Sequence, residues 1–232
     1  MRNLLILLLI FLTVATYSKE VKFSKNEFKR NEKSFGISFA LKGGYYQIDE
    51  KRNYYTKEVL GYDIERTVVG KFSSQGLGFE LEYRFNDSFS VYWGPSIFIL
   101  QGTIEKESKE GANKIKKEES VGYVPMKTAF GFKLSSGDVI GTGLVYYGRL
   151  GASFGNTASK LGSDTEDNQS YFSFDLELGM NVFILKNNNL DIFITASMGS
   201  GSEGNYGKDD DMDVLSGVID AFVGVRYNFF IF

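Results

Sequence analysis

Residues 171–185 read YFSFDLELGMNVFIL, and a large apolar side chain occupies every second position from Phe172 to Val182. The positions between them are small or polar, and they include Asp175 and Glu177. A period of two is the pattern of a β-strand whose two faces meet different surroundings. This stretch therefore predicts a strand with one oily face and one small or polar face.

The same alternation predicts seven further strands, at residues 34–48, 76–85, 89–99, 122–134, 139–154, 190–199 and 217–232. Three of the connections are short turns of Asn, Asp, Ser, Gly and Lys, at residues 86–88, 135–138 and 186–189. The other four are long and polar, at about residues 49–69, 103–120, 156–169 and 202–216. Short and long connections that alternate over an even number of strands are typical of an outer-membrane barrel, whose tilted strands need roughly 9–11 residues each.

The composition excludes several classes of chemistry. The 232 residues include 26 Gly, 21 Phe and 14 Tyr, which favours β structure, but no His and no Cys. Without these two residue types the chain has no Ser-His-Asp or Cys-His catalysis and no histidine or thiolate metal site. The net charge of −3 gives no indication of nucleic-acid binding. We expect no cofactor.

The first segment predicts export. Arg2 precedes an apolar run at residues 4–14, and small or polar residues follow at 15–18. This is the layout of a secretory signal peptide, and the run is shorter than the roughly 20 residues of a transmembrane helix. We expect residues 1–18 to be the signal peptide, cleaved after Ser18 or Ala15. Residues 19–33 would then form a flexible arm and residues 34–232 a single barrel domain.

Alternation alone does not decide which face points outward, because a soluble ligand-binding barrel turns its oily face inward. In this chain the oily face is bulky in every expected strand, and eight such faces would overfill a narrow interior. Aromatic residues also recur near strand ends, as in the girdles of membrane barrels, at Tyr45, Tyr83, Trp93, Tyr123, Tyr146, Tyr171 and Tyr227. The sequence therefore favours an oily exterior in contact with outer-membrane lipid, with a soluble secreted barrel as an alternative.

These features resemble those of the small outer-membrane β-barrel family, which includes eight-stranded OmpA-, OmpX- and OmpW-like proteins. The resemblance covers residues 34–232 and includes an aromatic C-terminal strand, YNFFIF at 227–232. The stretch GYVPMK at 122–127 is similar to a strand of outer membrane protein beta-barrel domain sequences. The resemblance implies a Gram-negative-type outer membrane and a partner during biogenesis, the barrel-assembly machinery, which reads such a terminus.

Eight charged residues fall on the polar face of the expected strands: Lys42, Glu80, Glu82, Lys127, Arg149, Asp175, Glu177 and Arg226. Buried charges are costly unless they are paired, so we expect a structural charge cluster that fills the lumen. Counting from the short turns places Arg149 at about the level of Asp175 and Glu177. A hydrolase built from carboxylates alone is an alternative, although enzymes of the resembling class depend on histidine. We therefore expect no catalytic residues.

The acidic run at residues 209–213 invites a calcium interpretation, because oxygen-rich clusters bind hard cations. It lacks the glycine and the glutamate that an EF-hand loop needs at its sixth and twelfth positions. We expect a solvated loop tip and no metal site.

The expected function is that of a non-enzymatic barrel with a structural or surface-interaction role. Its external loops would meet an unidentified host or envelope ligand, and no nucleic acid. A narrow channel for small solutes is the alternative within the same fold, although a lumen filled by paired charges predicts little conduction.

Overall fold

The computed structural model describes residues 34–55, 63–86, 88–110, 113–136, 144–157, 169–185, 188–203 and 212–231. These ranges form nine strands: β1 (Ser34–Tyr55), β2 (Asp63–Arg84), β3 (Phe89–Glu110), β4 (Asn113–Tyr123), β5 (Met126–Ser135), β6 (Leu144–Thr157), β7 (Gln169–Leu185), β8 (Asn188–Glu203) and β9 (Met212–Ile231). Within the same ranges, no helix has the length and apolar character to cross a membrane. The expected signal peptide and arm lie outside the described residues.

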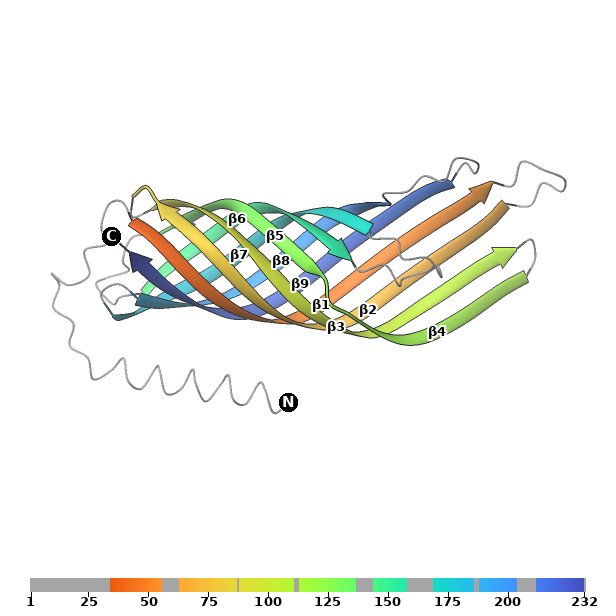
Figure 1. The fold of residues 1–232 in the computed structure, drawn as a ribbon, viewed down its shortest axis with the longest axis horizontal. Helices are drawn as coiled ribbons and strands as arrows, with labels where there is room; N and C mark the ends of the chain where they lie inside the picture. Colours follow the sequence, from red (N-terminus) through yellow and green to blue (C-terminus); the bar gives the residue numbers. More distant parts are fainter. Residues whose placement is uncertain are drawn as a thin grey trace.

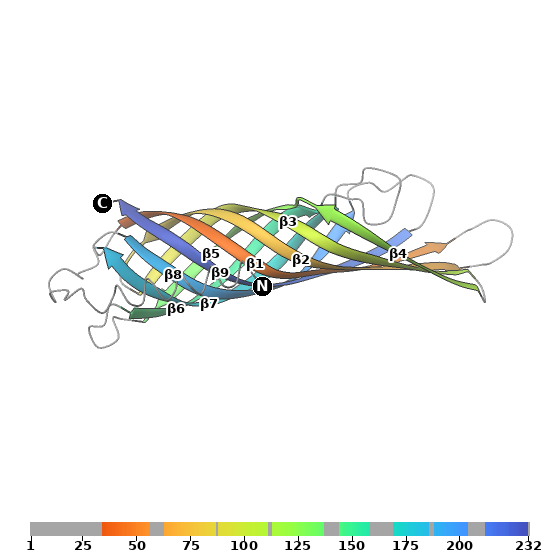
Figure 2. The same cartoon turned by 90° about the horizontal axis from the view of Figure 1, so that it is seen from below.

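The strands close into a barrel (Figures 1 and 2). Each described strand pairs antiparallel with its neighbours in the ring β1-β2-β3-β5-β6-β7-β8-β9, and β9 pairs back to β1 over a long seam. The closed eight-stranded antiparallel barrel predicted by the alternation is confirmed. Closure leaves no unpaired sheet edge in the ring. An unpaired edge would expose unsatisfied backbone N–H and C=O groups to the membrane interior, where they are costly.

Strand β4 continues β5 after a short interruption at Val124 and Pro125. Leu100 pairs with Tyr123 and Ile97 pairs with Met126, so the register with β3 is the same on both sides of the break. Proline has no N–H to donate to a ladder, which interrupts the pairing locally. The expected strand 122–134 is therefore two elements in one line.

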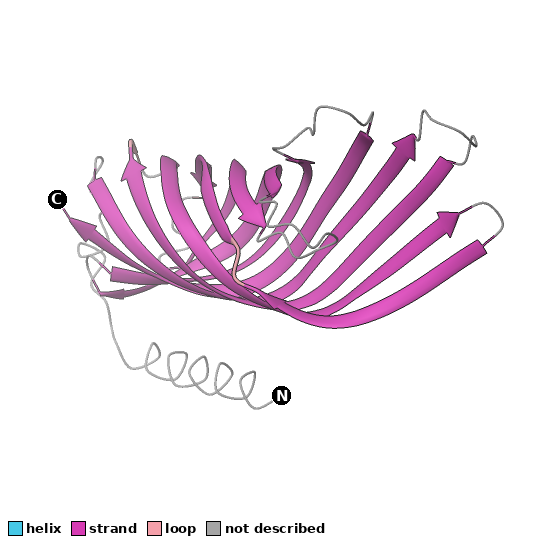
Figure 3. Ribbon diagram, turned by 45° about the vertical axis from the view of Figure 1, so that its right-hand side comes forward, coloured by secondary structure: helices cyan, strands magenta, loops and turns pink. Residues whose placement is uncertain are grey.

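At the long-loop end, β9, β1, β2, β3 and β4 remain paired further than β8 does, and this part of the sheet extends beyond the rest of the barrel (Figure 3). Pairing between β8 and β9 ends at Gly201 and Ser216, whereas β1 and β2 remain paired as far as Tyr55 and Asp63. We call the long-loop ends of β9, β1, β2, β3 and β4 the extended sheet. Within the described residues, β4 has β3 as its only strand partner and forms one edge of this sheet.

The extended sheet corrects the expectation of long connecting loops at residues 49–69 and 103–120. Most of these residues lie in the paired hairpins β1–β2 and β3–β4. The period of two continues there with inverted chemistry: Ile104 is buried on the inner face while Glu105 is exposed on the outer face. Because the outer face is polar here, oily alternation on that face does not mark these strands.

Between the short turns and the extended sheet, the outer surface is an apolar belt. Phe174 is 68% exposed, Phe39 61% and Leu77 59%, and similar side chains surround the described part of the barrel. A water-soluble monomer rarely exposes so large an apolar surface. The soluble barrel, with its oily face inside, is therefore contradicted.

Glycines inside the strands allow aromatic side chains to lie flat against the inner wall. A Cβ added at Gly155 would lie 2.2 Å from the Tyr171 ring, and one at Gly179 would lie 2.4 Å from the Tyr147 ring. A Cβ at Gly151 would lie 2.3 Å from the Tyr92 hydroxyl. Each glycine thus makes space for a ring from a neighbouring part of the wall.

Candidate functional site

The lumen is the candidate site, and its lower part, towards the short turns, is a charged zone. Six cations and six carboxylates of the described residues face inward there: Lys42, Arg84, Lys127, Lys133, Arg149 and Arg226, with Glu80, Glu82, Asp175, Glu177, Asp191 and Asp220. The charges of this zone therefore balance. Most of the twelve side chains are almost completely buried, so pairing is required for their stability.

Two arginines form the centre of the charged zone. Arg226 on β9 approaches Glu177 on β7 at 2.9 Å and Glu80 on β2 at 3.0 Å. Arg149 on β6 approaches the same Glu80 at 2.6 Å. Each guanidinium offers a planar set of donors, so one arginine can serve several carboxylates. The two arginines and two glutamates thus link four strands through the interior.

A second level of ion pairs lies below this centre. Lys133 lies 3.6 Å from both Glu82 and Asp191. Arg149 also reaches Glu82 at 3.3 Å, and Arg226 reaches Asp191 at 3.2 Å. The two levels therefore form one continuous network of ion pairs.

Lys127 forms the upper end of the charged zone. Its ammonium donates to Asp175 at 2.9 Å, to Ser197 at 2.9 Å and to Asp220 at 3.1 Å. Lys127 is on β5 and Asp220 is on β9, which stand on opposite sides of the eight-stranded ring. This ion pair spans the bore. Lys42 instead donates to the hydroxyl of Ser96 at 3.3 Å.

Aromatic faces cover the arginines. The Arg149 guanidinium lies 4.4 Å from the ring centre of Tyr92 and 5.7 Å from that of Tyr147. Arg226 lies 4.4 Å from the Phe193 ring centre. These cation–π contacts fill the space between the ion pairs, and both arginine side chains are almost completely buried.

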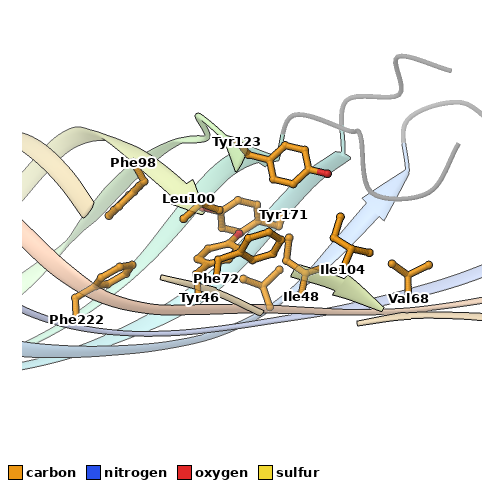
Figure 4. Packing of buried hydrophobic residues seen from close by; sticks show 11 residues of the cluster. Tyr46, Ile48, Val68, Phe72, Phe98, Leu100, Ile104, Tyr123, Tyr171 and Phe222 are labelled. Carbon is orange, nitrogen blue, oxygen red and sulfur yellow. The ribbon is translucent and has the colours of Figure 1, made fainter. Parts of the chain in front are cut away.

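Above the charged zone the lumen contains an apolar zone (Figure 4). Its buried residues are Tyr46, Ile48, Val68, Phe72, Phe98, Leu100, Ile104, Tyr123, Tyr171, Val218 and Phe222. The rings of Tyr46 and Tyr171, from β1 and β7, meet edge to face at 6.5 Å across the interior. Phe98 stacks on Phe222 at 5.0 Å. Aromatic packing therefore fills the bore at this level.

All eight residues of the expected cluster line the lumen. Arg149 contacts Glu177 at 3.5 Å, while Asp175 is held by Lys127 rather than by an arginine. The expected list omitted Arg84, Lys133, Asp191 and Asp220, which share the same inward parity. It also omitted the whole apolar zone. One signal in the sequence could have indicated the apolar zone. The inward face of β1 continues from Lys42 to the apolar side chains of Tyr46 and Ile48.

Among the residues that the structure describes, acidic side chains are not grouped in a way that suits a metal. No cluster of three or more Asp or Glu side chains in the described ranges is arranged to hold an ion. The acidic residues 209–211 lie outside those ranges.

Solved structures of similar fold are outer-membrane proteins. OprG of Pseudomonas aeruginosa has 14% identity and a TM-score of 0.45 over 83% of this chain and 95% of its own. Ail, the attachment invasion locus protein of Yersinia pestis, has 17% identity and a TM-score of 0.38 over 86% and 100%. The outer membrane protease OmpT of Escherichia coli has 9% identity and a TM-score of 0.32 over 91% and 100%. At these identities the likeness concerns the fold alone.

A comparison with curated protein sequences gives no match. The family model described as "Outer membrane protein beta-barrel domain" matches residues 4–229, which is nearly the whole chain. The family is one of outer-membrane proteins, in agreement with the apolar belt. The chain belongs to the outer membrane protein β-barrel domain family.

Proposed function

We propose that this protein is a closed, non-enzymatic barrel that presents an extracellular β-sheet for surface interactions. The observation that carries the proposal is the Lys127–Asp220 ion pair, which joins opposite walls of the lumen at 3.1 Å. A barrel whose opposite walls are joined by an ion pair is suited to anchoring the extended sheet above it.

Two successive barriers support a bore that is closed to ions. A permeating ion would have to displace paired charges such as Arg226 and Glu177, whose separation would leave both buried and unpaired. It would also have to cross the apolar zone, and a hydrophobic constriction excludes water. The channel alternative lacks a comparable supporting observation.

The extended sheet supports a surface role. Its outer face carries partly exposed ion pairs, Lys71 with Glu105 at 3.8 Å and Lys116 with Glu107 at 3.4 Å. Next to the rim, buried Val68 and Ile104 on the inner face oppose these polar side chains on the outer face, which is the arrangement of a sheet that stands in water. In the layout of this family the long-loop end faces outward, so the sheet meets the cell's surroundings.

The same geometry favours a non-enzymatic protein. A general acid or base needs a carboxyl group that can exchange a proton with a substrate. Glu80 and Glu177 are each held by both Arg149 and Arg226 in the interior, which engages their oxygens in ion pairs. The sequence has no histidine that could replace them.

Conductance in a planar bilayer tests the closed bore. We expect the refolded wild-type protein to give little or no steady current. Migration of unheated and heated samples on a gel shows in parallel that the barrel is folded. A large, steady single-channel current from folded protein would overturn the closed barrel and favour the channel.

An epitope tag tests the orientation. Placed at residues 111–112, between β3 and β4, the tag should be bound by antibody on intact cells. The matched insertion at residues 186–187, between β7 and β8, should be bound only after the cells are opened. The reverse pattern would overturn the extracellular sheet.

Export by a cleaved signal peptide in a Gram-negative-type envelope is part of the proposal. N-terminal sequencing of the mature protein tests it, with cleavage after Ser18 or Ala15 as the expected result. Insertion through the barrel-assembly machinery is tested by depletion of that machinery, which should reduce the folded form.

A further inference from the structure

A groove of about 470 Å³ lies on the outer surface of β7, β8, β9 and β1. It is lined by Gly43, Gly44, Tyr45, Leu176, Leu178, Ile194, Thr195, Ala196, Ala221, Phe222 and Val223. The outward members form two rows across the ladders. One row is Leu176, Ala196, Ala221 and Tyr45, and the next is Leu178, Ile194, Val223 and Gly43.

The depression results from side-chain size. Ala196 and Ala221 are paired neighbours on β8 and β9, and Gly43 lies in the adjoining row on β1. Larger residues stand on both sides, Leu176 on β7 and Tyr45 on β1. The small residues of three adjacent strands thus form a floor between two raised walls of larger side chains.

Water does not suit this groove. Its only lining side chain with a polar group besides Tyr45 is Thr195, whose hydroxyl donates inward to Glu177 at 3.2 Å. The Tyr45 hydroxyl donates to Gln47 at 2.7 Å, at the margin of the groove. A buried water needs two to four polar partners, and the floor offers none from its side chains. The groove therefore requires an apolar occupant.

We propose that the groove binds an acyl chain of a lipid in the extracellular leaflet. The groove is continuous with the lipid-facing belt, so hydrocarbon is the medium in direct contact with it. Its upper row ends at Tyr45, and the next outward residues of β1, Gln47 and Asp49, are polar. This places the groove in the extracellular half of the belt.

The expected preference of an acyl chain for the groove over the surrounding bilayer is moderate. Lipid chains are as apolar as leucine, so the hydrophobic effect does not distinguish the groove from the bilayer. The gain comes from van der Waals contact, because a chain in the groove meets the floor and both walls while a void there would lose those contacts.

Photo-crosslinking tests the proposal on the full-length protein in phosphatidylcholine vesicles that carry a diazirine in mid-chain. Label on the wild type should concentrate on Leu176, Ile194 and Val223. The filling variant Ala196→Leu/Ala221→Leu should lower that label roughly fivefold through lost contacts. Ala152→Leu, a small-to-large change on the outer face of β6, is the matched control and should leave it unchanged.

Heat-modifiable migration and the non-conducting state of each variant show that the barrel is intact, so this test can fail while the proposed function stands. Uniform labelling around the belt would overturn the proposal, as would unchanged labelling in the filling variant. Crosslinks between two copies through the groove would also overturn it and assign the groove to a protein contact.

Discussion

The barrel wall inside the belt and the extended sheet above it are built from the same strands in the same phase, with opposite chemistry. In β1, Leu41 points outward and is 57% exposed while Lys42 points into the lumen. Six residues further on, Ile48 is buried on the inner face and Asp49 is exposed outside. The direction of each side chain follows strand parity, and only the surroundings change.

This difference shows how a β-strand marks the limit of a membrane. Lipid favours apolar side chains on the outer face, which leaves polar groups to fill the interior as a network of paired charges. Water favours the reverse, an apolar interior and a polar exterior. Each region should therefore depend on its own medium for stability.

The largest effect is expected for Arg149→Ala. The change leaves Glu80 and Glu82 without one of their partners in the charged zone, and such a loss costs about 3–5 kcal/mol of unfolding free energy. Urea unfolding in lipid vesicles measures it. Arg149→Lys keeps the charge and should cost less. A neutral result for Arg149→Ala would mean that water enters the charged zone.

A phenylalanine in the apolar zone of the lumen should contribute much more to stability than one in the outer belt. Phe72→Ala removes a ring that is 1% exposed in the apolar zone, and it should cost about 3–4 kcal/mol because a cavity remains. Phe174→Ala, in the belt, should cost about 1 kcal/mol or less, since lipid chains fill the space. The same unfolding assay compares them, and equal losses would show that both sites have the same surroundings.

A charge placed on the outer face should locate the membrane. Leu150→Lys, midway along the belt on β6, should cost about 2–4 kcal/mol near the bilayer centre. Gln101→Lys, on the outer face of β3 above the belt, should change stability by about 0.5 kcal/mol or less. Similar costs for the two lysines would move the membrane boundary above Gln101.

The smallest effect is expected for Lys71→Ala on the extended sheet. Lys71 and Glu105 are half exposed and 3.8 Å apart, so water screens their attraction. The change in unfolding free energy should be about 0.5 kcal/mol or less and should vanish in high salt. A large, salt-independent loss would place this ion pair in a medium other than water.

The closed barrel was predictable because its outer face is oily in every strand, as in residues 171–185. The extended sheet was not, because Ile104 is an isolated apolar residue in a segment dominated by Lys and Glu. The break at Pro125 was not predictable either. It depends on which backbone hydrogen bonds form between the strands, and the period of the sequence does not give this.

The charged zone was predictable as a face but not as a set of pairs. Parity alone places Lys127 and Asp220 inward, yet their contact joins strands on opposite sides of the ring. Strand tilt and shear decide which residues share a level, and neither quantity can be obtained from a single strand. The partners of Arg149 required the assembled barrel for the same reason.

The seam between β1 and β9 has a kinetic consequence. Phe35 pairs with Ile231, almost the full length of the described chain apart, and contacts so distant in sequence form slowly. Arg226 of β9 reaches past β1 to Glu80 of β2, so this ion pair exists only after the seam has closed. Interactions absent from a folding transition state act on the unfolding rate. We therefore expect loss of the Arg226–Glu80 ion pair to act mainly on the rate at which the barrel unfolds.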